Sequence, residues 1–340
     1  MSASDVFVVG TGAVSPAGWG VPALVDAVRA KASLPVKELA RPGSEKPLRV
    51  RQVPPANPRP AWLTHARLRR ASPITHYSVA AGLEALGDDA ARVREGVIKV
   101  GVIVCVMSGC VNYSRRFYDE TLRDPATASP LVFPETVFNA PSSHLAALIG
   151  TEAINYTLVG DPGTFVQGMA LAADWLLGGA VDGCLVIGSE EIDWTTANAF
   201  HLFSRETVLS DGAGAVYLSR TPCEKAVKLA AISDSHLFNP GRSRADAVFR
   251  MRKDLNMNGS NTVLVDGLQA IRRYDAAEES VWRDWTAARS SPKKIVGEGL
   301  IAAAAWQTVL AVEGIRGGAS AALVSIVGTN QQAIGAAFTA

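Results

Sequence analysis

The chain has 340 residues, of which 48% are hydrophobic and 19% are charged, so it is long enough to bury a large core. Its formal net charge of +1 argues against nucleic acid or an anionic membrane surface as a partner recognised through overall charge. The opening residues, MSASDVFVVG, have no basic segment and only a short apolar run, so we expect a cytoplasmic protein with no signal peptide.

The first predicted element is a strand within VFVVGTGAVSPAG, residues 6–18, that runs into a glycine turn, and VPALVDAVRA, residues 21–30, predicts the helix after it. The glycines suggest a dinucleotide fingerprint, but Ser15 stands at the third glycine position. No acidic residue in a strand context follows at the distance that a ribose contact needs. We therefore predict no nucleotide, and we expect no other cofactor.

Residues 31–60 are rich in Pro, Arg and Lys, which predicts a surface loop with at most a short strand over 48–53. A helix is predicted from about Pro73, after the basic run ARLRR at residues 66–70. That run is either a solvated basic face or a docking site for an acidic partner such as an acyl carrier protein. A buried strand, VIKVGVIVCVMSGC, and then a polar helix follow.

The four cysteines are candidates for disulfides or metal ligands, but they show no C-x-x-C spacing. Cys184 lies inside an apolar run, where a small buried thiol is the simpler interpretation. His65 and His76 have no Cys, His or acidic neighbour at metal-ligand spacing. We therefore predict neither a disulfide nor a metal site.

The stretch NYTLVGDPGTFVQGMALAADWLLGGAVDGCLVIGSEEID, residues 155–193, predicts a strand, a turn, a helix and a second strand. Asp161 followed by Pro162 is typical of a helix start, with Asp161 as the N-cap. Between residues 164 and 177 the only charge is Asp174, so this helix must be covered by protein on most sides. A buried helix between strands indicates a layered α/β protein.

The layout of residues 162–188, a buried helix followed by a glycine stop and an apolar strand, occurs again over residues 298–328. Two helices that cannot face water can cover each other between two sheets. We therefore expect two similar halves, residues 1–220 and 221–340.

Several of these segments resemble the β-ketoacyl synthases of the thiolase superfamily. The opening string is similar to their V-V-T-G-x-G-x-V-S-P-x-G pattern. Residues 133–150 resemble their Pro-x-x-x-x-Asn-x-x-x-x-His segment, which Pro134, Asn139 and His144 match. The resemblance covers nearly the whole chain and implies a thiolase-like, five-layered αβαβα fold.

The family's reactive cysteine is missing. Counting forward from the Asn-Tyr that opens the strand, and back from the Gly-x-x-Asp after the helix, places Pro162 at the nucleophile position. Proline has neither a nucleophilic atom nor a backbone N–H, so it can neither carry an acyl group nor donate to an oxyanion.

Both catalytic histidines of the family are missing as well. Asp275 and Glu278 match the segment His-Gly-Thr-Gly-Thr-Pro-x-x-Asp-x-x-Glu and place Gly267 at its histidine. In the segment Lys-x-x-x-Gly-His, Lys293 matches the lysine and Glu298 replaces the histidine. Lys293, Asp275 and Glu278 could still form a supporting charge network.

Decarboxylative condensation needs a thiolate and two imidazoles, and none of the three altered positions supplies either. Within the family this pattern is similar to the chain-length factor, a catalytically inactive subunit. The resemblance implies pairing with an active β-ketoacyl synthase as a heterodimer, or else a homodimer, and contact with an acyl carrier protein. The pathway implied is type II polyketide, aryl-polyene or fatty-acid-like biosynthesis.

The resemblance also implies where the partner lies. Val137, Phe138 and Asn139 would line the partner's acyl tunnel or form plain interface core. The strand that contains Asn155, Tyr156 and Thr157 would pair with its counterpart across the two-fold axis.

Two other classes of function stay open. In the first, a thiolase-fold enzyme of altered chemistry would use Asp161 and Glu298 as an acid/base pair, and a perturbed carboxylate pKa beside a ligand-sized cavity would favour it. In the second, the chain would be a homodimeric scaffold that binds acyl carrier protein without a synthase partner.

Overall fold

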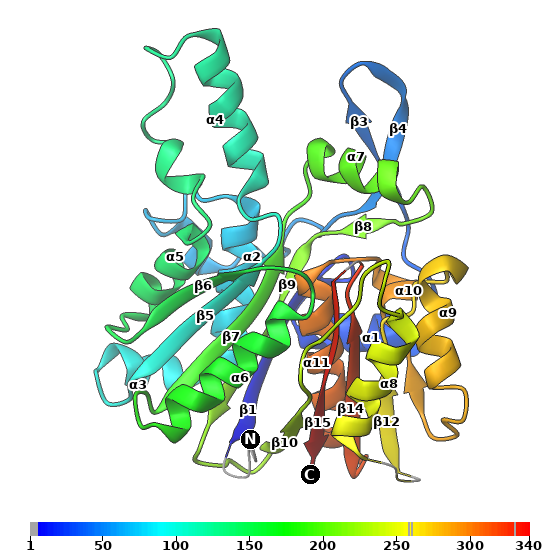
Figure 1. The fold of residues 1–340 in the computed structure, drawn as a ribbon. Helices are drawn as coiled ribbons and strands as arrows, with labels where there is room; N and C mark the ends of the chain where they lie inside the picture. The colour runs from blue at the N-terminus through cyan, green and yellow to red at the C-terminus, as the bar shows by residue number, and fades with distance from the viewer. Residues whose placement is uncertain (1–5, 258, 260, 330) are drawn as a thin grey trace.

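Two sets of five strands with the same order and directions build the molecule (Figure 1). The computed structural model describes residues 6–257, 259, 261–329 and 331–340, so part of the opening segment lies outside it. The first set, in spatial order, is β6 (Asn155–Val159), β5 (Val100–Val106), β7 (Gly183–Glu190), β9 (Gly212–Ser219) and β1 (Phe7–Ser15). The second is β13 (Arg289–Ser290), β12 (Thr262–Val265), β14 (Ala321–Val327), β15 (Gln332–Thr339) and β10 (Val227–Ile232).

In each set the first three strands are parallel and the last two are antiparallel to their neighbours. The two sets meet through a short antiparallel pairing of β1 with β10, in which Phe7 lies opposite Lys228 and Val8 opposite Val227. We propose residues 220 and 221 as the boundary between the halves, within the connection from β9 to β10.

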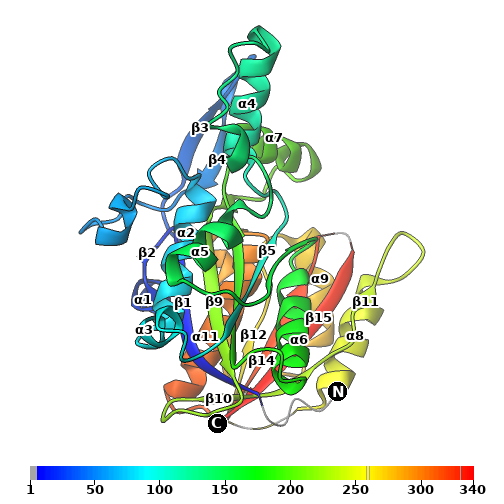
Figure 2. The same cartoon turned by 90° about the vertical axis from the view of Figure 1, so that its left-hand side faces the viewer.

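Helices form three layers around the two sheets (Figures 1 and 2). The central layer is α6 (Thr164–Leu177) and α11 (Ile301–Arg316), which contact each other and strands of both sets. One outer layer, on the first sheet, contains α2 (Pro73–Leu86), α3 (Asp89–Arg94) and α5 (Ala140–Ile149). The other, on the second sheet, is α8 (Arg244–Leu255), with α9 (Arg272–Val281) beside it. The predicted five-layered αβαβα fold is therefore confirmed.

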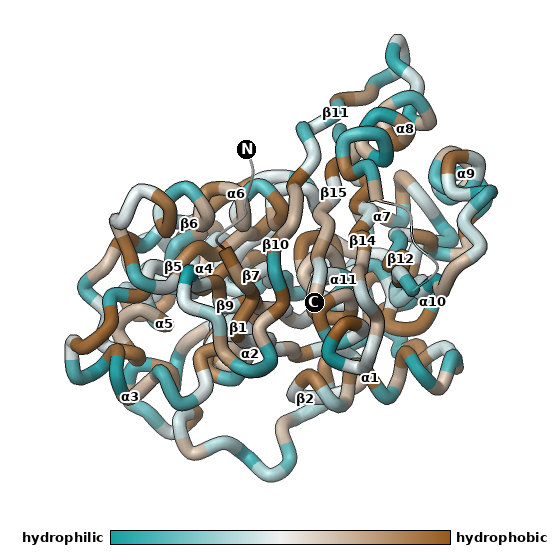
Figure 3. The backbone as a smooth tube through the Cα atoms, turned by 90° about the horizontal axis from the view of Figure 1, so that it is seen from below, coloured by the Kyte–Doolittle hydropathy of each residue, from teal (hydrophilic) through white to brown (hydrophobic). Residues whose placement is uncertain are grey.

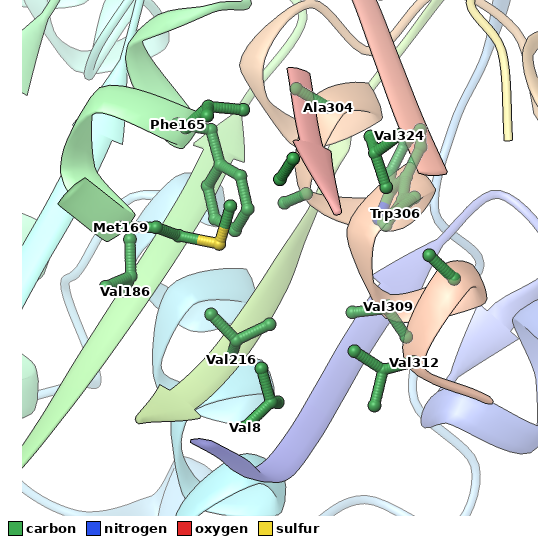
Figure 4. Packing of buried hydrophobic residues seen from close by; sticks show 14 of the residues in the cluster. Val8, Phe165, Met169, Val186, Val216, Ala304, Trp306, Val309, Val312 and Val324 are labelled. Carbon is green, nitrogen blue, oxygen red and sulfur yellow. The ribbon is translucent and has the colours of Figure 1, made fainter. Parts of the chain in front are cut away.

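The core lies between the two sheets, where the nearly uncharged helices meet. Figure 4 shows Phe165 and Met169 of α6 and Trp306 of α11 among the surrounding valines. The indole N–H of Trp306 donates to the carbonyl oxygens of Val14 at 3.1 Å and Ala213 at 2.9 Å, so its one polar group is satisfied. Burying each such large side chain contributes roughly 1.5–3 kcal/mol. In Figure 3 the central strands are mostly hydrophobic, whereas α8 is hydrophilic on its outer side.

The glycines that suggested a dinucleotide fingerprint let a helix approach the sheet. A Cβ on Gly10 would lie 1.8 Å from the carbonyl oxygen of Ala85, and a Cβ on Gly12 would lie 2.0 Å from that of Ala81. Both carbonyls belong to α2, which packs directly on β1. These glycines therefore have a packing role that needs no phosphate ligand.

Two segments project from the layered body (Figure 1). One is a hairpin of β3 (Lys37–Arg41) and β4 (Ser44–Arg51), extended by β8 (Leu209–Ser210) and contacted by α7 (Trp194–Phe203). The predicted surface loop over residues 31–60 is therefore wrong for residues 37–51, where two polar strands pair with each other, while the short strand expected over 48–53 overlaps the end of β4. The other projection is α4 (Val111–Arg123), none of whose residues is buried.

The remaining elements are short connections or edge pieces. They are β2 (Gly18–Trp19), α1 (Val21–Ala30), η1 (Ala61–Thr64), η2 (Phe133–Glu135), β11 (His236–Leu237) and α10 (Lys293–Val296). Within the described residues, no helix has the length and apolar character that crossing a membrane requires.

Candidate functional site

The turn before α6 contains the position expected for the nucleophile. Asp161 is buried, and its Oδ1 accepts a hydrogen bond from the backbone N–H of Gly163 at 3.0 Å and another from the side-chain amide of Gln332. The N–H of Thr164 donates to the carbonyl of Asp161 at 2.9 Å, which closes the turn around Pro162.

The prediction that Asp161 is the N-cap of a helix starting at Pro162 was wrong by two residues. The helix begins at Thr164, and Gly163 is its N-cap. The chain completes the tight turn before the helix starts. The first regular helical hydrogen bond is that of the Gln167 N–H to the Gly163 carbonyl, at 3.2 Å. Asp161 therefore stabilises the turn that leads into the helix.

The second carboxylate oxygen of Asp161 faces the backbone of another segment. Among the described residues Oδ2 has no hydrogen-bond partner, and a Cβ on Gly328 would lie only 2.3 Å from it. Burial raises the pKa of Asp161 above its ordinary value. The oxygen is thus packed against glycine, at a place where no other residue would fit.

Gly267, at the position of the family's first histidine, is held by Glu278. The N–H of Gly267 donates to Glu278 Oε1 at 3.2 Å, and the hydroxyl of Ser325 donates to the same oxygen. Glu278 is fully buried, and that burial, with a smaller effect of the neighbouring Asp266, raises the pKa of Glu278 to about 7. The carboxylate occupies the space beside Gly267, since a Cβ there would lie 3.2 Å from its Oε2.

Asp275 shapes the same loop from its other end. It accepts the backbone N–H of Gln269 at 3.0 and 3.2 Å and that of Ile271 at 3.0 Å. Asp275 and Glu278 are thus both bonded to the loop of residues 267–271, and each satisfies backbone donors that would otherwise be buried without partners.

Glu298, at the position of the second histidine, forms a buried ion pair with Lys293. The Lys293 ammonium lies 2.8 Å from Glu298 Oε2, which also accepts the side-chain amide of Gln269 at 2.7 Å. Oε1 accepts the N–H of Leu300 at 2.8 Å. Both oxygens of Glu298 are therefore occupied.

The predicted network of Lys293, Asp275 and Glu278 is brought together only indirectly. Lys293 pairs with Glu298, whereas Asp275 and Glu278 bond to the loop of residues 267–271. Gln269 connects them, because its N–H donates to Asp275 and its side chain to Glu298. The glutamines at 269 and 332 escaped sequence reasoning because they belong to no motif and their partners lie far along the chain.

These residues offer little of the chemistry of a carbon–carbon bond-forming site. Pro162 and Gly267 carry no reactive side-chain atom, and the oxygens of Glu298 are bonded within the protein. No hydrogen bond joins Asp161 to Glu298 in the described part of the chain. Among the residues that the structure describes, no group of three or more His, Cys, Asp or Glu side chains is placed to hold a metal ion.

The thiols do not replace the missing nucleophile. Cys105, Cys110 and Cys184 are buried free cysteines, and Cys223 is an exposed one. Burial raises the pKa of Cys110 to about 12 and raises those of Cys105 and Cys184 as well, so all three stay protonated at neutral pH.

A second feature is a set of exposed apolar side chains on β6 and on the segment just before α5, which we call the β6 face. Tyr156 and Val159 of β6 are 52% and 55% exposed, and Val137 and Phe138 are 41% and 46% exposed. β6 pairs with β5 on one side and, among the described strands, ends the sheet on the other. The predicted interface residues Asn139, Asn155 and Thr157 lie beside it, and Thr157 is hydrogen-bonded to Ser142 at 3.0 Å.

No family model and no curated protein matches this sequence. Solved structures do match it over the whole chain. The ishigamide ketosynthase/chain length factor has a TM-score of 0.80 and 18% identity, over 98% of this chain and 99% of that one. The AntDE:AntF complex, a type II PKS acyl-carrier protein with its ketosynthase bound to the hexaketide, has a TM-score of 0.79 and 16% identity, over 100% of both chains.

A third match is the ketosynthase ApeO in complex with its chain length factor ApeC from Xenorhabdus doucetiae. It has a TM-score of 0.76 and 13% identity, over 99% of this chain and 98% of that one. At such identities the likeness establishes the architecture, and this chain therefore has the thiolase-like fold of ketosynthases and chain length factors.

Proposed function

We propose that this chain is a catalytically inactive ketosynthase-like subunit, a chain-length factor, that pairs with an active β-ketoacyl-ACP synthase and shapes its acyl tunnel. The proposal is supported by the ketosynthase-like fold of the whole chain, together with the sequence counts that place Pro162, Gly267 and Glu298 where the three catalytic residues are expected. The pathway proposed is type II polyketide, aryl-polyene or fatty-acid-like biosynthesis, and the proposed location is the cytoplasm.

The chemistry of the three positions supports inactivity. An acyl-enzyme needs a nucleophile, and the stabilisation of an enolate oxygen needs donors aimed at it. The one side chain among the three that can ionise, Glu298, is paired with Lys293 and would repel a malonyl carboxylate if the pair were broken.

The β6 face supports a partner. An open strand edge beside exposed apolar side chains is a site of aggregation unless another chain covers it. The strand sequence NYTLV contains no charged residue or proline, the features that commonly protect such edges. An active synthase that covers this face would bring Val137 and Phe138 next to its own acyl chain.

An acyl carrier protein is the second proposed partner. In the run ARLRR, Leu68 is buried while Arg67, Arg69 and Arg70 are exposed, so the basic side chains face solvent. Next to them lies a groove of about 670 Å³. It is lined by Arg69, Arg115, Arg116 and Arg123 together with Asp119 and Glu120, which pair with Arg115 and Arg116. Four arginines against two carboxylates leave the groove positive, which suits the acidic surface of a carrier protein.

The decisive experiment is co-expression with an active β-ketoacyl synthase that has an intact Cys-His-His triad, followed by native mass measurement. We expect a one-to-one heterodimer in preference to either homodimer. The purified chain alone should show no covalent mass shift with acyl- and malonyl-carrier proteins and should form no ketoacyl product. Turnover in protein free of host synthase would contradict the proposal.

A homodimeric acyl-carrier-binding scaffold is the second candidate, because the open edge of β6 could be covered equally well by a second copy of this chain. A stable homodimer that ignores the synthase would favour it. The acid/base enzyme has weaker support: the pKa of Asp161 is raised by burial, but both oxygens of Glu298 are already bonded.

A further inference from the structure

A hydrogen bond beside Pro162 crosses the boundary between the two halves. Asp161 belongs to the first half and Gln332 to the second, and the Gln332 amide donates to Asp161 Oδ1. The amide oxygen of Gln332 in turn accepts from Gln167 Nε2 of α6 at 3.3 Å and from the hydroxyl of Ser235. A single buried side chain, that of Gln332, thus ties the start of α6 to β15.

Glu298 makes a second connection of this kind through its backbone. Its N–H donates to the carbonyl of Val208 at 2.9 Å, and its carbonyl accepts the N–H of Ser210 at 2.9 Å, so it forms a bridge beside β8. Its side chain holds Lys293 and Gln269 of the second half. Glu298 therefore joins the first half to two segments of the second.

The turn between β14 and β15 is fixed from outside as well. The guanidinium of Arg244, at the start of α8, donates to the carbonyl of Gly328 at 3.2 Å and to that of Thr329. It also lies 4.7 Å from the centre of the Phe238 ring. Gly328 is thus held between Arg244 on one side and the carboxylate of Asp161 on the other.

We propose that these contacts form a clasp, defined as Asp161–Gln332 together with the backbone bonds of Glu298 to Val208 and Ser210, which fastens the two halves and closes the space beside Pro162 to an acyl group. The side chains of Lys293 and Gln269 hold Glu298 in place from within the second half. The closure concerns this chain alone and does not depend on the proposed function.

The test uses the full chain in the assembly in which it purifies. Gln332→Ala should lower the melting temperature by about 1–4 °C and Glu298→Ala by more, because buried partners lose their hydrogen bonds and Lys293 loses its counter-charge. The matched controls are Gln331→Ala and Glu279→Ala, because both side chains are exposed and neither belongs to the clasp. The controls should change the melting temperature by less than about 1 °C. Equal melting temperatures in clasp and control variants would overturn the fastening role.

The closure is tested by calorimetric titration with octanoyl-pantetheine. We expect no saturable binding to the unmodified chain, and binding to appear in Gln332→Ala, where the wall beside Asp161 is cut back. If Gln332→Ala does not fold, Gln332→Asn retains the amide on a shorter side chain and should admit the probe more weakly. Saturable binding of octanoyl-pantetheine to the unmodified chain would overturn the proposal. Failure to pair with a synthase would instead count against the proposed function and leave the clasp intact.

Discussion

The turns that lead into the two central helices repeat one arrangement with different charge partners. Before α6, Asp161 accepts the N–H of the residue two positions on at 3.0 Å, and before α11, Glu298 does the same at 2.8 Å. In both halves the helix begins one residue later. Glu298 has a lysine partner, whereas Asp161 has only the Gln332 amide and its own turn. The carboxylate has the same local role in both turns, but the side chains that hold it differ: Lys293 of the same half for Glu298, and Gln332 of the other half for Asp161.

The largest effect is expected when Lys293, the cation beside Glu298 before α11, is replaced. Lys293→Met leaves Glu298 buried without a counter-charge, so the free energy of unfolding should fall by about 3–5 kcal/mol. Chemical denaturation measures the change. Lys294→Met is the control, because Lys294 is exposed while Lys293 is buried. Adding Glu298→Gln to Lys293→Met should recover part of the loss, and no recovery would argue against the ion pair as its cause.

The second prediction concerns pH. Burial raises the pKa of Glu190 to about 8 and that of Glu191 to about 7, and the pKa values of Glu278 and Asp161 are raised for the same reason. The folded state therefore binds protons more tightly than the unfolded state, so its stability is greatest below pH 4–5 for these groups and is lost as pH rises toward 8. We expect the free energy of unfolding to fall as the pH rises from 5 to 9.

Denaturation at a series of pH values tests this expectation, and Glu190→Gln should flatten the profile more than any surface Glu→Gln change. Glu190 accepts the backbone N–H of Met107 with Oε1 at 2.5 Å and that of Ser108 with Oε2 at 3.0 Å, and the single amide oxygen of a glutamine can keep only one of these bonds. A profile that rises with pH over this range would contradict the assignment.

The third prediction concerns Asp161, in the turn before α6. Asp161→Ala removes the acceptor for Gly163 and Gln332 and should destabilise by about 1 kcal/mol. Asp161→Asn, which keeps an acceptor oxygen, should cost less. If Asp161 were an acid/base catalyst, both changes would abolish an activity, and Asp161→Asn would leave the melting temperature unchanged.

For Pro162→Cys we expect no change in activity. Pro162→Cys places a thiol at the nucleophile position, but Gly267 and Glu298 still provide no imidazole, so no ketoacyl product should form. A carrier-protein assay with product detection checks this. Measurable condensation by the Pro162→Cys chain alone would show that the loss of the cysteine was the only barrier.

The partner side of the proposal has its own variant. Enlarging Val137 to Trp on the β6 face should shorten the product of a paired synthase without stopping it, because the side chain would intrude into the tunnel. Val97→Trp is the matched control, since Val97 is also exposed but precedes β5 at its other end. Unchanged product length in an intact complex would count against a tunnel role for Val137.

Much of the fold could be predicted from local patterns, because the run from Thr164 to Leu177, in which Asp174 is the only charge, and the glycine stops are strong signals in short windows. The hairpin of β3 and β4 could not, since Lys37–Arg41 and Ser44–Arg51 carry charges on most exposed positions and become strands only by pairing with each other. Tertiary pairing of this kind leaves little trace in composition.

The candidate site divides in the same way. The register of Asp275 and Glu278 located Gly267, and the structure places all three around one loop. The partners Gln269 and Gln332 could not be found, because Gln332 meets Asp161 across 171 positions of the chain. The tunnel and interface roles of Val137, Phe138 and Tyr156 stay predictions.

The contact between α6 and α11 has a consequence for how such a chain could arise. Each helix is apolar on most sides, so a protein cut at residue 220 would expose one flank of α6 to water and would have no means of covering it. A gene coding for only one of the five-stranded units would therefore have needed two identical copies, helix against helix, to give a stable product. On this view the duplication that joined them turned a symmetric pair into a single polypeptide, and from then on its two members were free to diverge.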